Sequence, residues 1–293
     1  MTREFSEPDY PPLRNAANRA SISAQRVFLR LNRIQLLLLT SAAFVSGVQF
    51  KNPEHQHEES WVVFVIMLTA LAVTTVLRIG KFDDRWFRCR AYAENFKSLV
   101  WLYVMSANAS SDSSEQEYLN SIAHLKERLP DLQKEFARYG IAGKLITDWM
   151  CKARSLTVEH KLAMYHALRI DDQMNWYSDK AKFNSRKEGE WFWSIVVIEF
   201  LAVAGAALQA NQLLQLNPVS GIAALGTALI AWSQIKRFSD LGTSYAIAAN
   251  DICEIAESHR RVETQAELDV FVQQIETAVS REHSMWLARR SVV

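Results

Sequence analysis

Four apolar runs, almost free of charge, constrain this chain more than any other feature of its sequence. Each is close to the shortest length, about 17 residues, that crosses the hydrocarbon core of a bilayer as a helix. The runs form two pairs, each joined by a short loop, and such pairing disfavours helices buried in a soluble core. We therefore predict four transmembrane helices in two hairpins. The runs cover residues 34–50, 61–77, 191–208 and 219–235.

Basic residues lie on one side of both hairpins. Arginines precede the first run, Lys and Arg recur between the second and third runs, and Lys236 and Arg237 follow the fourth. The loop 51–60 holds three Glu and one Lys, and the loop 209–218 carries no charge. Because Lys and Arg are enriched in cytoplasmic flanks, we expect a multi-pass protein of the cell inner membrane with both termini in the cytoplasm. Its first partner is then the lipid bilayer.

The second half of the chain repeats the organisation of the first. A shift of about 155 residues lays the second pair of runs over the first pair and Asn95 over Asn250. Both hairpins then run in the same direction, which predicts a parallel tandem duplication and not an inverted repeat. Pro130 marks the end of the first module. The predicted two-transmembrane modules are 1–130 and 157–293, with 131–156 as a helical connector.

The segments outside the runs favour long cytoplasmic helices. From Thr157 the sequence contains no Gly or Pro until Gly189, and it then continues into the third run. A helix over such a stretch, rising about 1.5 Å per residue, would lead from the cytoplasm into the membrane. No segment alternates apolar and polar residues as a half-buried strand does. The predicted fold class is therefore all-α.

Charge and motif content exclude several function classes. Lys and Arg total 33 against 32 Asp and Glu, a net charge of +1, so no concentrated basic face favours a nucleic-acid partner. Cys89, Cys151 and Cys253 stand alone, without the spacing of a disulfide framework or a metal site. His55 and His57 in the first loop are more typical of solvated side chains. We expect no enzymatic activity, no cofactor and no metal site.

Glu199 is the one ionisable residue inside the four runs. Placing a charged carboxylate at the centre of a spanning helix costs about 2.5–3.5 kcal/mol on insertion scales, so the side chain should face protein or water. One interpretation makes Glu199 a pore-lining or gating group that is repeated around an oligomer. The other makes it a protonated side chain that hydrogen-bonds to Thr227 or Ser233 of the fourth run. The sequence leaves both open.

Small residues recur at four-residue spacing in the fourth run. Such spacing lets helices approach one another closely in a membrane, and it predicts a helix-packing face. Four short spans enclose no wide aqueous path, so any pore requires a homo-oligomer. The predicted face consists of Ser220, Ala224 and Ala228.

A set of polar and aromatic residues precedes the third run. Most neighbours in the set are three or four residues apart, which places them on one side of a helix. They form a candidate face for a signal or a partner. The alternative is a set of ordinary pairs along the helix, each worth about 0.2–0.5 kcal/mol. The set is Arg169, Asp172, Gln173, Trp176, Tyr177 and Lys180.

Segment 165–186, which runs directly into the third apolar run, resembles the SLATT domains of bacteria. These are two-transmembrane modules linked to SMODS nucleotidyltransferases and SLOG nucleotide sensors. The same set of six residues, together with Ala181, carries the resemblance. The first half resembles a second, divergent SLATT module, because its arginine-rich lead-in 14–33 lacks the Asp-Gln-Trp-Tyr run.

The resemblance implies a function that the residues alone do not show. It implies a membrane effector of a prokaryotic conflict or antiviral defence system, which forms an oligomeric pore or disrupts the membrane when a cytoplasmic signal arrives. A nucleotide-signalling or sensor protein is the partner that it implies. The alternative is a non-conducting membrane scaffold that recruits a cytoplasmic partner through its long helices.

Overall fold

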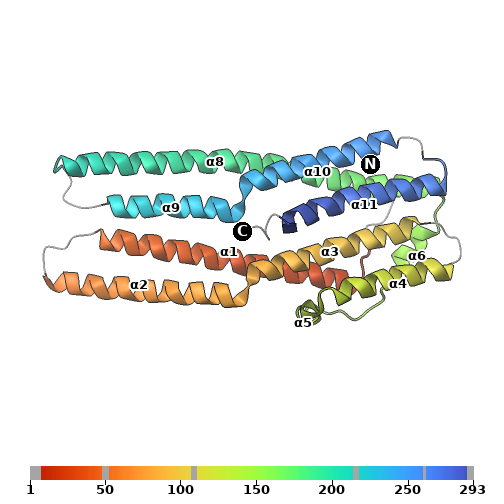
Figure 1. The fold of residues 1–293 in the computed structure, drawn as a ribbon, viewed down its shortest axis with the longest axis horizontal. Helices are drawn as coiled ribbons and strands as arrows, with labels where there is room; N and C mark the ends of the chain where they lie inside the picture. The colour runs from red at the N-terminus through yellow and green to blue at the C-terminus, as the bar shows by residue number, and fades with distance from the viewer. Residues whose placement is uncertain (1–7, 48–52, 107–110, 214–217, 260–261, 289–293) are drawn as a thin grey trace. The chain divides into compact units, whose positions relative to one another are not determined.

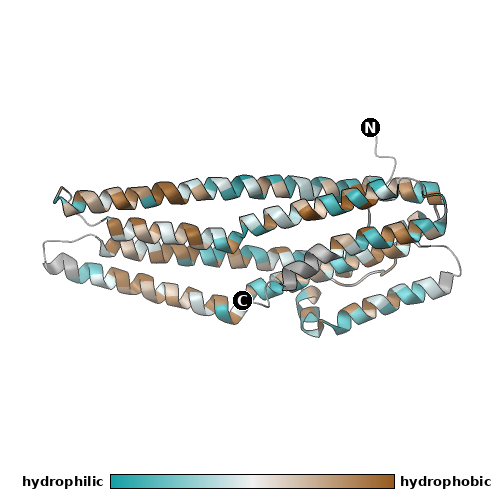
Figure 2. Cartoon of the chain, turned by 45° about the horizontal axis from the view of Figure 1, so that its top comes forward, coloured by the Kyte–Doolittle hydropathy of each residue, from teal (hydrophilic) through white to brown (hydrophobic). Residues whose placement is uncertain are grey.

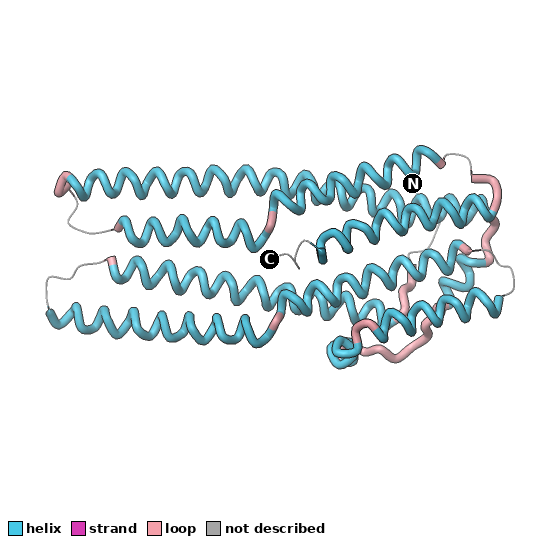
Figure 3. The backbone as a smooth tube through the Cα atoms, in the orientation of Figure 1, coloured by secondary structure: helices cyan, strands magenta, loops and turns pink. Residues whose placement is uncertain are grey.

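The computed structural model describes residues 8–47, 53–106, 111–213, 218–259 and 262–288. These residues form helices and contain no strand (Figure 3), which confirms the all-α prediction. The longer helices are α1 (Pro12–Ser46), α2 (Pro53–Gly80), α3 (Phe82–Met105), α4 (Ser111–Glu127), α8 (Asp171–Ala210), α9 (Val219–Lys236), α10 (Phe238–Ser258) and α11 (Gln265–Ala288) (Figure 1). The shorter ones are the 3₁₀-helix η1 (Pro130–Leu132), α5 (Gln133–Ala137), α6 (Asp148–Arg154), α7 (Val158–Tyr165) and the π-helix η2 (His166–Ile170).

The chain divides into two compact units, and each unit draws on both halves of the sequence. Unit 1 holds the described residues of Met1–Ala24, Asp83–Ala181 and Thr243–Val293. Unit 2 holds those of Gln25–Phe82 and Lys182–Gly242. Helices α1 and α8 therefore begin in unit 1 and end in unit 2. The units cut across the two sequence modules, whose boundaries stay a prediction.

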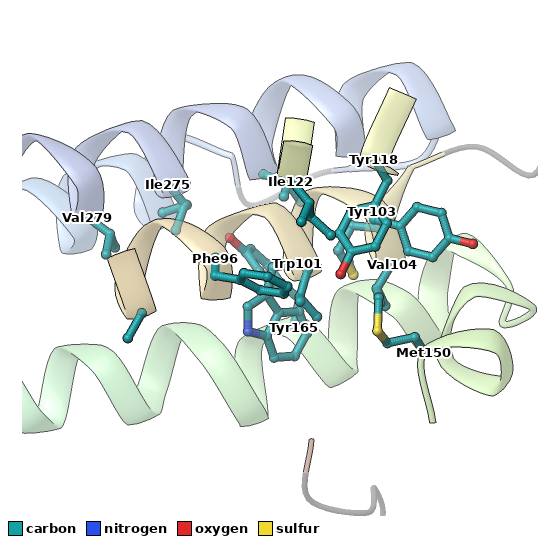
Figure 4. Packing of buried hydrophobic residues seen from close by; sticks show 14 of the residues in the cluster. Phe96, Trp101, Tyr103, Val104, Tyr118, Ile122, Met150, Tyr165, Ile275 and Val279 are labelled. Carbon is teal, nitrogen blue, oxygen red and sulfur yellow. The ribbon is translucent and has the colours of Figure 1, made fainter. Parts of the chain in front are cut away.

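Unit 1 has a core of buried aromatic and aliphatic side chains. Trp101 of α3 lies edge-on to Trp149 and Tyr165, with ring centroids 5.7 and 5.4 Å apart. Tyr103 lies beside Tyr118 of α4, 4.7 Å away (Figure 4). Large aromatic side chains bury about 150–250 Å² each, so these contacts contribute much of the apolar burial that holds unit 1 together. Helix α3 supplies many of the buried residues, from Cys89 to Met105.

Unit 2 consists of apolar helices whose large side chains are widely exposed (Figure 2). Three helical stretches of the described chain are long and apolar enough to cross a membrane, namely Pro12–Ser46, His57–Met105 and Val158–Ala210. They hold most of the first predicted run and all of the second and third. Residues 48–50 of the first run lie outside the described residues. Helix α9, which carries the fourth run, has 18 residues, ends near Lys236 and is not among the three.

Helix α9 is covered on two sides by other helices of unit 2. A side chain at Gly221 would meet the ring of Phe44 in α1. On the other side, a Cβ atom at Gly226 would lie 3.5 Å from Ile198 of α8. The guanidinium of Arg33 sits 4.8 Å from the ring centroid of Trp232. Helix α9 thus packs against both α1 and α8.

Both hairpins end in the same backbone break. Lys81 after α2 has a φ of 42°, and Arg237 after α9 has a φ of 51°. Non-glycine residues rarely adopt this left-handed conformation, and each is followed by a phenylalanine that opens the next helix, Phe82 in α3 and Phe238 in α10. The pattern basic-Phe-x-Asp at both breaks, 81–84 and 237–240, is a repeat signal that the sequence carries in each half.

Two glycine substitutions test the packing of α9. Gly221→Ala should lower the thermal unfolding temperature, because the new methyl group overlaps Phe44 and overpacking costs about 1–3 kcal/mol. Gly189→Ala in α8 has open space around it and should raise the temperature, since Ala is favoured over Gly in a helix by about 1 kcal/mol. The measurement is thermal unfolding of the full chain in detergent. Equal shifts for both variants would contradict the α1–α9 contact.

Candidate functional site

Glu199 lies on α8 in unit 2 with its side chain exposed. Within the described residues, its carboxylate has no hydrogen bond or ion pair. The suggested partner Thr227 instead donates its hydroxyl to the carbonyl oxygen of Ala223, 3.0 Å away in its own helix. Nothing in the described part of one chain therefore neutralises Glu199.

The predicted packing face on α9 is only partly covered. Ala224 and Ala228 are half-buried, and Ser220 is exposed, although its hydroxyl lies 3.4 Å from the carbonyl oxygen of Ala43. The closest approaches of α9 occur one or two positions away, at the buried glycines 221 and 226. A second line of α9 is exposed, and several of its members are polar or small. Its residues are Ser220, Ala223, Thr227, Ile230 and Gln234.

The candidate signal face before the third run divides into two sides. Three of its residues are buried, namely Arg169, Gln173 and Tyr177. Of the others, Trp176 is half-buried, and Asp172 and Lys180 are exposed. The buried three are spaced four residues apart, one helical turn, and they face the core of unit 1. The ammonium of Lys180 lies 5.9 Å from the ring centroid of Trp176.

Arg169 belongs to a buried ion pair that the sequence did not reveal. Its Nε and Nη2 atoms donate to the two carboxylate oxygens of Glu276 in α11, at 2.9 and 2.6 Å. Tyr165 donates its hydroxyl to the same carboxylate at 2.9 Å, and Nη1 of Arg169 donates to Gln173 at 3.0 Å. Arg169 is 0% and Glu276 2% exposed. Burial lowers the pKa of Arg169, but the Glu276 carboxylate more than offsets this, so the pKa is raised overall.

A second group of charged side chains adjoins this pair in unit 1. Trp101 donates its indole N–H to the Tyr10 hydroxyl at 3.0 Å, and the Arg14 guanidinium lies 4.6 Å from the Tyr10 ring centroid. Lys97 lies 3.5 Å from the side-chain oxygen of Gln173. Burial lowers the pKa of Lys97 to about 8, and the positive charge of Arg169 adds to the effect. Unit 1 thus holds several cations in a poorly hydrated region.

The two halves contribute to this region through one short motif. Tyr-x-x-Leu-Arg occurs at 10–14 and again at 165–169, a repeat that places the two arginines in matching positions. Arg169 has the acidic partner Glu276. Arg14 has a buried Nε atom without a hydrogen-bond partner among the described residues. The motif could have been found from the internal repeat, but the partner Glu276, 107 residues along the chain, could not.

A groove of about 900 Å³ opens beside Glu276 in unit 1. Helices α3, α4 and α11 each line it with residues at the spacing i, i+3, i+4 and i+7. Most of its lining residues are polar, although apolar atoms make up most of the lining surface, and its volume lies within the range of about 300–1,000 Å³ typical of small-molecule sites. Glu276 therefore touches both the groove and Arg169. Polar residues of the groove include Asn95, Ser98, His124, Arg128 and Gln273.

Metal-binding residues do not converge in the part of the chain that the structure describes. No group of three or more His, Cys, Asp or Glu side chains there is placed to hold a metal ion. His57 in the first hairpin accepts a hydrogen bond from the indole N–H of Trp61 at 3.3 Å. The three cysteines are free thiols, with Cys89 buried and the other two exposed.

Comparison with protein families matches both halves of the chain. Residues 11–162 match the model described as SMODS and SLOG-associating 2TM effector domain 3. Residues 165–286 match the model described as SMODS and SLOG-associating 2TM effector domain 1. No curated protein matches the chain, and no solved structure does. The two matches stand in tandem and meet just before the Tyr165–Arg169 motif.

Breaking the buried ion pair should destabilise unit 1. Arg169→Met leaves Glu276 buried without its partner, and such a loss costs about 3–5 kcal/mol. The double variant Arg169→Met/Glu276→Leu should recover most of that loss, because no charge is then buried alone. The measurement is thermal unfolding of the full chain in detergent. Lys144→Ala, which breaks the exposed Lys144–Asp148 pair, is the control and should leave the unfolding temperature nearly unchanged, because exposed ion pairs contribute little to stability. A double variant no more stable than Arg169→Met would contradict the assignment.

Lys97 should make stability depend on pH in the alkaline range. Its pKa is about 8 in the folded chain and near the ordinary 10.5 when unfolded. A Lys whose pKa falls on folding destabilises the fold at low pH, and this penalty is relieved as pH rises from about 8 to 10.5. Lys97→Met should therefore raise the unfolding temperature most below pH 8. The gain over the wild-type chain should shrink toward pH 10.5, and a constant gain would exclude this origin.

Proposed function

The chain belongs to the SLATT family of two-transmembrane effectors, and from this premise we propose that it is an effector of a prokaryotic conflict or defence system that permeabilises the membrane. Helices α1 and α2 form one transmembrane hairpin and α8 and α9 the other. Both enter from the cytoplasmic side of the cell inner membrane, with both termini in the cytoplasm. Several copies assemble around a pore, which a cytoplasmic signal opens.

The observation that carries this proposal is the continuity of α8. The helix runs without interruption from Asp171 to Ala210, a length of about 60 Å. It starts directly after the π-helix that holds Arg169 and ends in the third apolar run. π-Helical turns are rare and frequently occur at functional sites. A change in the Arg169–Glu276 contact would therefore shift or rotate a helix that extends into the membrane.

Helix α1 connects unit 1 to an apolar run in the first half, as α8 does in the second. It begins at Pro12, two residues after Tyr10, and its first turn contains Arg14. It continues to Ser46 in the first apolar run. Both modules thus start in the polar region of unit 1 and lead into apolar helices of unit 2. The groove beside Glu276 is the place where a small polar signal would act on this region. Its source would be the nucleotide-signalling or sensor partner that the family description names.

The pore needs polar surface, and unit 2 supplies it from the second hairpin. Glu199 of α8 is exposed, as are Ser220, Thr227 and Gln234 of α9. Rings of acidic side chains favour cations in channels. Because one chain brings only four short spans, the polar residues of several copies are needed to enclose water. We expect the pore to be a homo-oligomer that prefers cations.

A scaffold that recruits a partner is the second candidate function. It is favoured by Asp172 and Lys180, whose side chains are exposed on α8. In that case the apolar helices only anchor the chain in the membrane, and the exposed face of α8 binds the partner.

Potassium flux from liposomes that contain the purified full chain separates the two functions. Glu276→Gln removes the charge that holds Arg169 and should raise basal flux several-fold. Adding Glu199→Leu to that variant should lower the flux again, because the pore loses its acidic ring. Glu190→Gln, an exposed carboxylate of α8 outside the third run, is the matched control for Glu199. No flux from any correctly inserted variant would exclude the pore and favour the scaffold.

A further inference from the structure

Helix α8 carries two parallel lines of residues in the third apolar run, displaced by one position. The first line packs inside the chain, and we name it the inner seam. Its Ile198 lies against Gly226 and its Gly205 against Val219, both in α9. Its Trp191 stacks on Phe238, with centroids 6.4 Å apart. The inner seam consists of Trp191, Ile195, Ile198, Ala202 and Gly205.

The second line, the outer seam, has the same spacing of four and three residues and no cover from the described chain. Phe192 is 57% exposed, Val196 36% and Val203 69%. Alternating steps of four and three residues are the spacing by which one helix packs along another. All five members of the line are exposed. The outer seam consists of Phe192, Val196, Glu199, Val203 and Ala206.

Lipid alone is a poor cover for this seam. Its apolar members suit acyl chains, but Glu199 stands in the middle of the line. A charged carboxylate at the centre of a span costs about 2.5–3.5 kcal/mol, and such groups almost always face protein or water. Because Glu199 has no partner within the described chain, the partner must come from outside it.

A second copy of the chain meets this requirement. The other three apolar runs contain no ionisable residue, so no basic side chain in the spans offers a salt bridge. Two identical α8 helices that pack along their outer seams bring the two Glu199 side chains to the same depth. Two carboxyl groups can then share one proton, which removes one charge and forms a hydrogen bond between the copies.

We propose that the outer seam of α8 is the contact between neighbouring copies of this chain, with the Glu199 carboxyl groups hydrogen-bonded across it. The proposal names the contact that joins copies in pairs within the proposed pore, because a surface that both copies share closes a dimer, and it rests on the membrane location of α8 but not on conduction. In this arrangement Glu199 lies where two copies meet at the proposed pore, and the polar line of α9 adds further surface for water.

Disulfide cross-linking of the full chain in proteoliposomes tests the contact. Cys151 and Cys253 are exposed and are replaced by Ser, while the buried Cys89 stays. Val196→Cys and Val203→Cys should each give covalent dimers on oxidation, because a disulfide needs Cα atoms within about 7 Å. Val197→Cys and Leu201→Cys are the matched controls. They are 54% and 47% exposed but lie off the seam, and they should cross-link several-fold less.

The role of Glu199 is tested in the Val203→Cys background. Glu199→Gln keeps hydrogen-bonding groups on both copies and should retain cross-linking within about twofold. Glu199→Ala removes them and should reduce it several-fold, since interhelical hydrogen bonds in membranes contribute about 1–2 kcal/mol in model peptides. Equal cross-linking with Ala would remove Glu199 from the contact and overturn that part of the proposal.

The outcomes separate this inference from the proposed pore. Cross-linking along the seam without flux supports the contact and excludes the pore. Flux without cross-linking at the seam, or equal cross-linking at the two control positions, overturns the contact and leaves the pore standing. Because the liposomes contain this chain alone, absent dimers would mean that lipid covers the seam, and this would overturn the contact.

Discussion

The buried pair of Arg169 and Glu276 is the interaction on which the organisation of unit 1 depends. Two charges taken out of water are stable only if each finds its partner in good geometry. The two carboxylate oxygens, the guanidinium and the Tyr165 hydroxyl meet that condition. The pair therefore fixes α11 against the π-helix, and with it the start of α8. Any ligand or partner that competes for Glu276 acts on that start.

The duplication explains why this pair occurs once and not twice. Both halves keep the Tyr-x-x-Leu-Arg motif and the basic-Phe-x-Asp break after the hairpin. The second half adds Glu276 and Glu199, and no acid of the described chain bonds to the Nε atom of Arg14. One half of a duplicated protein can hold the common core while the other acquires charged contacts. The second half is accordingly the one in which we place both the response to a signal and the assembly of copies.

The sequence predicted what depends on local composition and missed what depends on distant packing. Long apolar runs and the absence of strand patterns were enough for the all-α fold and for three of the spans. The fourth run was not confirmed as a span: α9, which carries it, has 18 residues and includes Gln234 and Lys236 at its end. The six residues from Arg169 to Lys180 divide into a buried side and an exposed side, and their own sequence did not show this division. Contacts with α3, α10 and α11, all distant in the sequence, decide which of them are buried.

The two seams of α8 let one helix serve both the fold and the assembly that we propose. A one-residue step moves a position by about 100° around a helix, so two lines of equal spacing fit on α8 without overlap. The inner seam contains Gly205, where α9 approaches closely. The outer seam contains Glu199, which no close neighbour in the described chain could satisfy. A variant in which Gly205 and Glu199 were exchanged would disrupt both the packing of α9 on α8 and the proposed contact between copies.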